Sequence, residues 1–239
     1  MAKALLFLKA ADGSAPALLN AVQSFAETAY ASIQHCGSTL RVMASLEEDP
    51  LCNRPRPNHL ADVTIEIKTQ PGQPLALADW DNLAGQLGEC LDAGQSLALV
   101  MHEYCWRPSA PQPICYHYLM VRRADFSPAD YSDYYLHYRK RFGMITPGIE
   151  AYSQNIIDQP SSKKLCETSG LGFYEVTSIS EMYMRDIDTF LSSPAMAEIG
   201  PEAGEDEARF VDRAASVMFC SSIVLSLGDQ STIKERSCL

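Results

Sequence analysis

The sequence predicts an α+β fold in which two copies of one β-α-β-β-α-β unit follow each other and close into a single barrel. First, "KALLFLKAADGS", residues 3–14, and "CYHYLMVRRADFS", residues 115–127, each contain an apolar strand, a turn and a helix start. Second, matching residues of these two stretches lie 113 positions apart, namely Lys9 and Arg122, Asp12 and Asp125, and Ser14 and Ser127. Third, the proline-rich "WRPSAPQP", residues 106–113, is typical of a linker.

Each half is predicted to contain four strands and two helices in the split βαβ, or ferredoxin-like, order. In the first half, residues 1–110, we expect strands near 3–10, 38–46, 61–68 and 95–103, and helices near 16–34 and 76–92. In the second half, residues 111–239, we expect strands near 114–122, 149–157, 173–179 and 214–225, and helices near 128–142 and 181–192. The two sheets can bury their exposed faces against each other as an intramolecular dimeric α+β barrel. Two unrelated α/β domains are the alternative.

The first helix of the second half begins with a capping box. Ser127 suits the N-cap, Pro128 the first helical position, and Asp130 completes the S-x-x-D pattern. Aromatic residues then recur at helical spacing, and Gly143 is placed to end the helix; they are Tyr131, Tyr134, Tyr135, Tyr138 and Phe142. Most of these tyrosines are expected to face the core, where their hydroxyls either support packing or stud an apolar pocket.

The charge of the chain argues against two kinds of partner. Among 239 residues, 30 acidic and 19 basic residues give a net charge of −11. Nucleic acid and an anionic membrane would both repel such a surface, so neither is expected, and a small organic ligand remains open. The apolar run Ala4 to Leu8 is too short for a secretory segment or a membrane span. We therefore expect a cytoplasmic protein.

The cysteines are expected to be reduced thiols. No pair has C-x-x-C spacing, and most are interpreted as small core hydrophobes. They stand at positions 36, 52, 90, 105, 115, 166, 220 and 238. No cluster of cysteine and histidine has metal-ligand spacing, so no metal is expected. The motifs of dinucleotide-binding proteins, P-loop NTPases, zinc proteases and α/β-hydrolases do not occur.

Four stretches of the second half carry a resemblance to a known family. They are "VRRADFS", "PADYSDYYLHYRKRFG", "PGIEAYSQNII" and "YEVTSISEMYMRDIDTFLSSPAMAEIGPEAGEDEARFVDRAASVMF". Over residues 114–225 the chain resembles the EthD-like family of the dimeric α+β barrel superfamily, and the first half resembles it only as a degenerate repeat. That family usually has a histidine four residues after an aromatic residue of the first helix. Counting from Tyr135 gives Arg139 here, and His137 lies two residues earlier.

The resemblance implies a function in small-molecule metabolism. Related α+β barrels include cofactor-free cyclases, isomerases, dehydratases and decarboxylases, cofactor-free oxygenases and haem enzymes. We expect a homodimeric, cofactor-free lyase or isomerase that acts by proton transfer on a small hydrophobic or aromatic metabolite. The alternative is a non-catalytic binding or assembly protein whose first half serves only for dimerisation. Haem ligated by one of the five histidines is a further alternative.

Proton transfer requires a base, an acid and an oxyanion donor in one pocket. His117 and His137 are the candidate bases, and Tyr134 and Tyr152 are the candidate donors. Because His117 matches Ala4 in the first half, packing of the unit does not itself require a histidine there. The candidate substrate-binding residues are Tyr116, Tyr118, Tyr135, Arg139 and His102. The enzyme hypothesis predicts that these four catalytic candidates line one enclosed cavity of roughly 300 Å³ or more, and it largely fails if they point to separate surfaces.

Two polar segments are interpreted as connections. The segment "EEDPLCNRPRPNHL", residues 47–60, collects Arg54, Arg56 and His59, and is either a solvated connection or a lid or anion-binding edge. The acidic segment "IGPEAGEDEARF", residues 199–210, is expected to be a solvated loop that closes onto the last strand.

Overall fold

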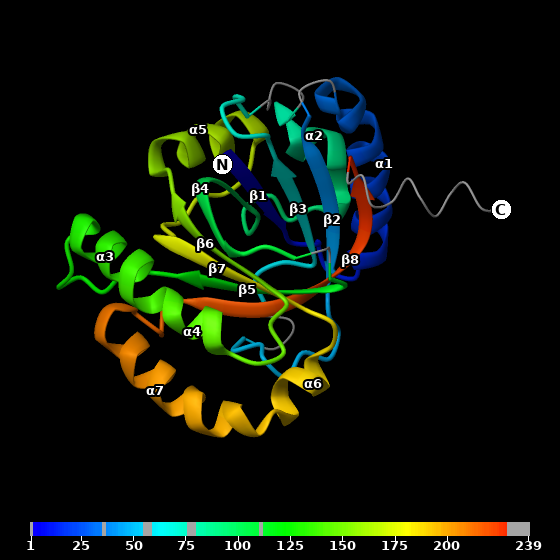
Figure 1. The fold of residues 1–239 in the computed structure, drawn as a ribbon. Coiled ribbons are helices and arrows are strands. Elements are labelled where there is room, and N and C mark those ends of the chain that lie inside the picture. Colours follow the sequence, from blue (N-terminus) through cyan, green and yellow to red (C-terminus); the bar gives the residue numbers. More distant parts are fainter. Residues whose placement is uncertain (1, 35–36, 55–58, 76–79, 110–111, 229–239) are drawn as a thin grey trace.

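Eight antiparallel strands close into one barrel in the computed structural model, which describes residues 2–34, 37–54, 59–75, 80–109 and 112–228 (Figure 1). The strands are β1 (Ala2–Leu8), β2 (Thr39–Ser45), β3 (Val63–Lys68), β4 (Leu97–Arg107), β5 (Ile114–Met120), β6 (Ala151–Ile157), β7 (Ser178–Met184) and β8 (Val217–Leu227). Their order around the barrel is β1-β3-β2-β8-β5-β7-β6-β4, and β4 pairs with β1 again. The predicted barrel of two ferredoxin-like units is therefore confirmed.

The two halves join at two seams. Within the first half the strands run β4-β1-β3-β2, and within the second half they run β8-β5-β7-β6. At the seams, β2 pairs with β8 and β4 pairs with β6. Because every outer strand of one half pairs with the other half, the two units share one barrel. The division into domains of residues 1–110 and 111–239 stays a prediction.

The helices cover the outside of the barrel (Figure 1). They are α1 (Ala15–Ile33), α2 (Leu83–Leu87), α3 (Pro128–Tyr134), α4 (Lys140–Ile145), α5 (Gln159–Ser169), α6 (Ile187–Ser192) and α7 (Pro194–Phe210). A 3-10 turn, Gly88–Cys90, follows α2, and a π-helical turn, Tyr135–Arg139, joins α3 to α4. The helix expected near 76–92 is thus short, with residues 76–79 outside the described part. In the described ranges, no helix has the length and apolarity needed to cross a membrane.

The capping box at the start of α3 is confirmed. The Ser127 hydroxyl accepts a hydrogen bond from the Asp130 amide and donates one to the Asp130 carboxylate at 2.6 Å. The expected end at Gly143 is wrong, because the helix continues to Ile145. A Cβ atom at Gly143 would overlap the ring of Tyr152, so this glycine serves close packing of α4 on β6.

Strand β7 lies further along the chain than its sequence pattern predicts. A strand was expected near 173–179 and a helix near 181–192, but β7 extends to Met184 and α6 begins only at Ile187. Both faces of β7 carry polar groups: Glu181 points into the barrel, whereas Ser178 and Ser180 meet tyrosine hydroxyls outside it. The apolar alternation of a half-buried strand is therefore absent.

The acidic segment 199–210 is helical rather than a loop, since it forms most of α7. Its acidic groups are not only solvated: Asp206 is buried and accepts a hydrogen bond from Tyr134, and Glu207 accepts one from Tyr118 at 2.6 Å. These bonds hold α7 against the barrel despite Pro201 within the helix. Tertiary contacts here outweigh the weak helix propensity of the segment.

Equivalent backbone positions of β1 and β5 are 112 residues apart, not 113. Ala10 bridges Leu91 as Arg122 bridges Val211. The Ser96 hydroxyl accepts a hydrogen bond from the Lys9 amide, and in the same way the Ser216 hydroxyl accepts one from the Val121 amide. The helices keep the 113-residue separation, because α1 begins at Ala15 and α3 at Pro128. The loop of the second half is therefore one residue longer.

This one-residue difference changes which residue of the first half is equivalent to His117. Its counterpart in the first half is Leu5, not Ala4, as the register pairs Leu5 with Glu66 and His117 with Glu181. Successive strand residues point to opposite faces, so Ala4 lies on the outer face of the barrel, whereas Leu5, like His117, points into its interior.

We predict that Gly143→Ala destabilises the protein by about 1–3 kcal/mol, because the added methyl group overpacks the contact between α4 and Tyr152. Gly200→Ala is the matched control: it lies in α7, where a Cβ atom would meet no atom within 4 Å. Urea unfolding of both variants measures the difference. Equal stability of the two variants would contradict the assignment of Gly143 to a packing role.

Candidate functional site

The structure separates the residues expected to form one catalytic pocket. His117 is fully buried inside the barrel, between the rings of Phe7 and Phe219. His137 is exposed on the outside, where its Nδ1 atom lies 2.9 Å from a carboxylate oxygen of Asp133. His102 is exposed on the outer face of β4.

The tyrosines form a layer between the outside of the barrel and the helices. The hydroxyl of Tyr131 lies 2.7 Å from the Ser178 hydroxyl, and that of Tyr135 lies 3.0 Å from the Ser180 hydroxyl. Tyr134 and Tyr118 donate to α7, as described above, and Tyr116 donates to the sulfur of Met218. Their hydroxyls are thus engaged in packing the helices onto β5 and β7.

Tyr152 is buried beneath α4, also outside the barrel wall, and the side chain of Arg139 lies outside the described part. The expectation that His117, His137, Tyr134 and Tyr152 line one cavity is therefore wrong. The sheet separates His117 from the two tyrosines, and solvent surrounds His137. Their individual catalytic roles stay predictions.

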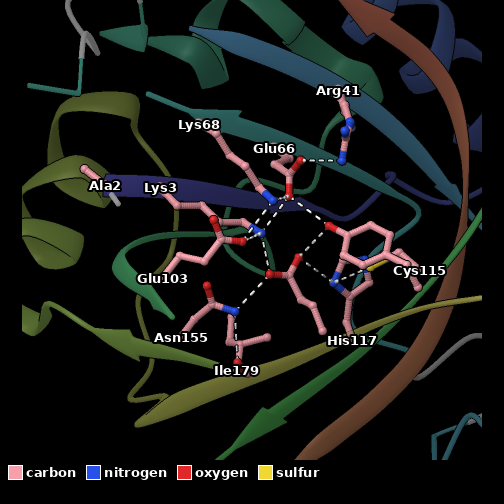
Figure 2. Close-up of polar contacts among 12 residues, drawn as sticks. Ala2, Lys3, Arg41, Glu66, Lys68, Glu103, Cys115, His117, Asn155 and Ile179 are labelled. Carbon is pink, nitrogen blue, oxygen red and sulfur yellow. Dashed lines mark hydrogen bonds and ion pairs between the residues drawn. The ribbon is translucent and has the colours of Figure 1, made fainter. Parts of the chain in front are cut away.

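The interior of the barrel holds a buried ionic network at one end (Figure 2). The ammonium group of Lys3 contacts the carboxylates of Glu66 at 2.6 Å, Glu103 at 3.6 Å, and Glu181. Lys68 lies 2.9 Å from Glu103, and Arg41 lies 3.3 Å from Glu66. Three cations thus face three carboxylates, which come from both halves of the chain.

The network keeps Lys3 and Glu66 charged. Burial by itself favours neutral Lys3, but Glu181, Glu66 and Glu103 outweigh it and raise the pKa of this lysine above its usual value. Burial would also raise the pKa of Glu66, but Lys3, Lys68 and Arg41 lower it well below the usual range. His117 behaves differently: burial lowers its pKa to about 4, so its imidazole is neutral at physiological pH.

A small cavity of about 140 Å³ opens beside this network. Arg41, Lys68, Glu103 and Tyr183 line its inner part, and Tyr152 reaches its rim. Cavities that enclose metabolites usually measure about 300 Å³ or more. This one is therefore too small for an aromatic metabolite.

A second polar cluster lies beyond the opposite end of β1. His59 Nε2 is 2.7 Å from Asp62 Oδ1, and Lys9 Nζ is 3.3 Å from His59 Nδ1 and 3.4 Å from Asp62 Oδ2. The side chains of His59 and Asp62 are more than nine-tenths buried, and that of Lys9 is 11% exposed. Together they form the wall of a cleft of about 520 Å³. We call Lys9, His59 and Asp62 the cleft triad.

The elements that border the cleft explain its shape. Lys9 follows β1 and Asp62 precedes β3, and the pairing of these strands brings the two side chains together. The other walls are small apolar residues from the loop and the start of α1: Ala10, Ala11, Ala15 and Pro16. Asp12, Glu47 and Asp92 add acidic groups to the lining.

Asp62 is held as a carboxylate. Burial would raise its pKa, but the hydrogen bond from His59, the bond from the Ala10 amide and the charge of Lys9 together lower it to about 2. A histidine whose ring nitrogen is oriented by a carboxylate can accept a proton at its other nitrogen, and the carboxylate then stabilises the imidazolium. The Lys9 ammonium lies 3.3 Å from both ring nitrogens of His59, so it has to turn toward the substrate before Nδ1 can accept a proton.

The second half contains the counterpart of this cleft without the triad. Val121 takes the position of Lys9, and Thr177 takes that of Asp62. The Thr177 hydroxyl accepts a hydrogen bond from the Arg122 amide, just as the Asp62 carboxylate accepts one from the Ala10 amide. A hollow of about 580 Å³ adjoins these positions; it is lined by residues such as Arg123, Asp125 and Arg213, and not by Val121 or Thr177. The fold therefore does not require a charged triad at this position.

Sequence reasoning identified only part of the triad. His59 was noted in the 47–60 segment, together with Arg56, which lies outside the described residues, and Arg54, whose guanidinium binds the Ala214 carbonyl at 3.0 Å. Lys9 entered only as a repeat position, and Asp62 not at all. The available signal was H-x-x-D directly before an apolar strand.

Comparisons with known proteins show the fold alone. No family model and no curated protein matches the chain. Among solved structures, an anthrone oxidase-like protein aligns with TM-score 0.56 at 11% identity, covering 95% of this chain and 92% of that chain. A candidate chlorite dismutase aligns with TM-score 0.54 at 11% identity, covering 94% of each chain. A candidate monooxygenase from Fusobacterium nucleatum aligns with TM-score 0.54 at 7% identity, covering 94% and 93%. All three likenesses show the α+β barrel fold.

We predict that Lys3→Met destabilises the protein by about 3–5 kcal/mol, because it leaves buried carboxylates without their cation. Arg141→Met is the matched control, since Arg141 pairs with Glu202 at the surface and should change stability little. Chemical denaturation measures both. A Lys3→Met protein as stable as the control would show that the network contributes nothing to the fold.

We predict that Asp62→Asn lowers stability by about 1–2 kcal/mol at neutral pH. The pKa of Asp62 is depressed in the folded protein, so its contribution is present above the unfolded pKa and is lost as pH falls through about 2. The difference from the parent should therefore shrink between about pH 4 and pH 2. Unfolding measured across this range, with the exposed Asp12→Asn as control, tests it. A difference that is independent of pH would exclude the charge as its cause.

Proposed function

We propose that the protein is a cofactor-independent lyase or isomerase that moves a proton within a small metabolite, and that the cleft triad is its reacting centre. The observation that carries this proposal is the unequal pair of clefts. The same backbone is built with Val121 and Thr177 in one half, yet the other half buries a lysine, a histidine and a carboxylate at a cleft wall. Ionisable groups that cluster in a cleft, one of them Asp62 with a depressed pKa, are typical of functional sites.

The triad supplies the groups that proton transfer needs. His59 Nδ1 takes a proton from a carbon next to a carbonyl or carboxylate group, so the C–H bond breaks and an N–H bond forms. The electron pair moves to the substrate oxygen, and the Lys9 ammonium stabilises the resulting enolate. Asp62 stays ionised and stabilises the imidazolium, which makes it a positioning residue. Return of the proton to another carbon, or loss of a leaving group, completes an isomerisation or a lyase reaction.

The walls of the cleft favour a substrate with a polar and an apolar part. Its oxygen would meet Lys9, and its hydrocarbon part would lie against Ala10, Ala11 and Pro16. The volume of about 520 Å³ is in the range of metabolite sites. A hydrophobic or aromatic acid or ketone fits these walls.

Other sequence-based expectations remain predictions beside this proposal. They are membership of the EthD-like family, homodimerisation, a cytoplasmic location, and catalytic roles for His117, His137, Tyr134 and Tyr152. The proposal differs from them in locating the base in the first half, at His59.

The test is solvent exchange followed by proton NMR in D₂O, with a panel of small aliphatic and aryl 2-oxo acids, ketones and unsaturated acids. At least one compound should lose its α-proton signal in the presence of the protein. His59→Gln should slow this exchange by about 10²–10⁴-fold, and Lys9→Met should reduce it as well. Asp125→Asn, in the counterpart cleft, is the matched control and should not change the rate. Exchange that persists in His59→Gln would move the base elsewhere, with His117 as the next residue to replace.

A non-catalytic binding or assembly function is the second candidate. The mutual satisfaction of the tyrosine hydroxyls favours it, because these groups were the expected polar lining of a pocket in the second half. On this alternative the panel would show binding by calorimetry without exchange over long incubation. Exchange of any compound that depends on His59 excludes it.

A further inference from the structure

We propose that Cys115, His117 and Glu181 bind a divalent metal ion inside the barrel, and that Zn²⁺ is the ion they suit best. This site is separate from the cleft triad, because none of its three residues lines that cleft. Thiolate, imidazole and carboxylate together are the donor set that Zn²⁺ prefers.

The three donor atoms are already close to a binding geometry. They lie within 4.8 Å of one another, and His117 Nδ1 is 3.8 Å from both Cys115 Sγ and Glu181 Oε1. Metal–donor bonds of about 2.0–2.3 Å in a tetrahedron place such donors about 3.4–3.6 Å apart. The two distances from His117 Nδ1 exceed this spacing by a few tenths of an ångström.

The strands hold these donors rigidly. Cys115 and His117 are alternate residues of β5 and share its inner face, and β7 places Glu181 directly opposite His117. The same register places Tyr183 opposite Cys115, and its hydroxyl donates to Glu66 at 3.0 Å and to Glu181 at 3.4 Å.

The hydrogen bonding of the cluster leaves room for an ion. Glu181 Oε2 is occupied by Lys3 and by the Asn155 amide at 2.9 Å, whereas Oε1 has only Tyr183, at 3.4 Å. At 3.8 Å, His117 Nδ1 is too far from Oε1 for a hydrogen bond. Among the described residues, Nε2 of the same buried ring also has no hydrogen-bond partner. Nδ1 is the nitrogen that faces the other two donors, and among the described residues its hydrogen bond is a long one, to the Cys115 thiol at 3.8 Å.

The two halves differ at these four positions in a way that fits a metal. The counterparts of Cys115, His117, Glu181 and Tyr183 are Lys3, Leu5, Glu66 and Lys68. In the first half, the side chains of Lys3 and Lys68 supply the positive charge next to Glu66. In the second half, the lysine positions hold a thiol and a phenol; Lys3 neutralises Glu181 from across the barrel, and a metal ion would neutralise the thiolate of Cys115.

The test is refolding in the presence of metal, because the enclosed interior limits entry into the folded barrel. The full chain is unfolded, reduced and refolded with Co²⁺ as a spectroscopic substitute for Zn²⁺, or with a chelator. Refolding with Co²⁺ should give near-ultraviolet thiolate-to-cobalt absorption and visible bands of tetrahedral Co²⁺. Refolding with Zn²⁺ about 100-fold above its dissociation constant should raise the thermal midpoint by about 5–10 °C over the chelator sample.

Three variants make the test specific. Cys115→Ala should abolish the thiolate absorption, and His117→Leu, which copies Leu5 of the first half, should abolish tetrahedral binding while keeping the packing. Cys166→Ala is the control, since this buried thiol bonds to Ala98 away from the cluster. A folded parent protein without the absorption, or absorption that survives in Cys115→Ala, would overturn the proposal.

Discussion

The ammonium group of Lys3, surrounded by three carboxylates, is the interaction on which the rest of the barrel depends. Glu66, Glu103 and Glu181 come from β3, β4 and β7, so one cation ties together strands of both halves. Such groups are costly to remove from water, and their cost is offset only when all partners are in position. A slip of one residue in any of these strands would turn a carboxylate outward and leave Lys3 unpaired. The network therefore selects the register of the barrel as well as stabilising it.

The sequence predicts the architecture well because the repeat and the capping signals are local. It fails where tertiary contacts decide, as in β7, whose polar residues serve the interior network and the tyrosine layer. Helix α5 was not predicted, although Asp158 caps its start, Pro160 follows at once and Gly170, with a φ of 75°, ends it. The single extra residue in the second loop reversed the expected face of the counterpart of His117, since side chains alternate with a period of two.

The candidate site was harder to predict than the fold for a physical reason. Lys9 and His59 are 50 residues apart, and only the pairing of β1 with β3 shows that they meet. The tyrosines, which carried the expected chemistry, have hydroxyls that bond to serines and to acidic residues of α7. No spacing rule could distinguish these uses, because a tyrosine stripe on a helix looks the same whether its partner is a ligand or another part of the chain.

The covalent link between the two halves has a consequence for what such a barrel can contain. In a symmetric pair of identical single units, each position would occur twice. A lysine at the Lys3 position would then bring two ammonium groups into the same small interior, and the equivalent position could not hold Cys115 instead. One chain that carries both units is free of this doubling. It can hold a lysine on one side and a thiol on the other, and a cleft with a buried lysine, histidine and aspartate in one half opposite a cleft without them. Asymmetry of this kind lets one unit specialise while the other keeps the barrel closed.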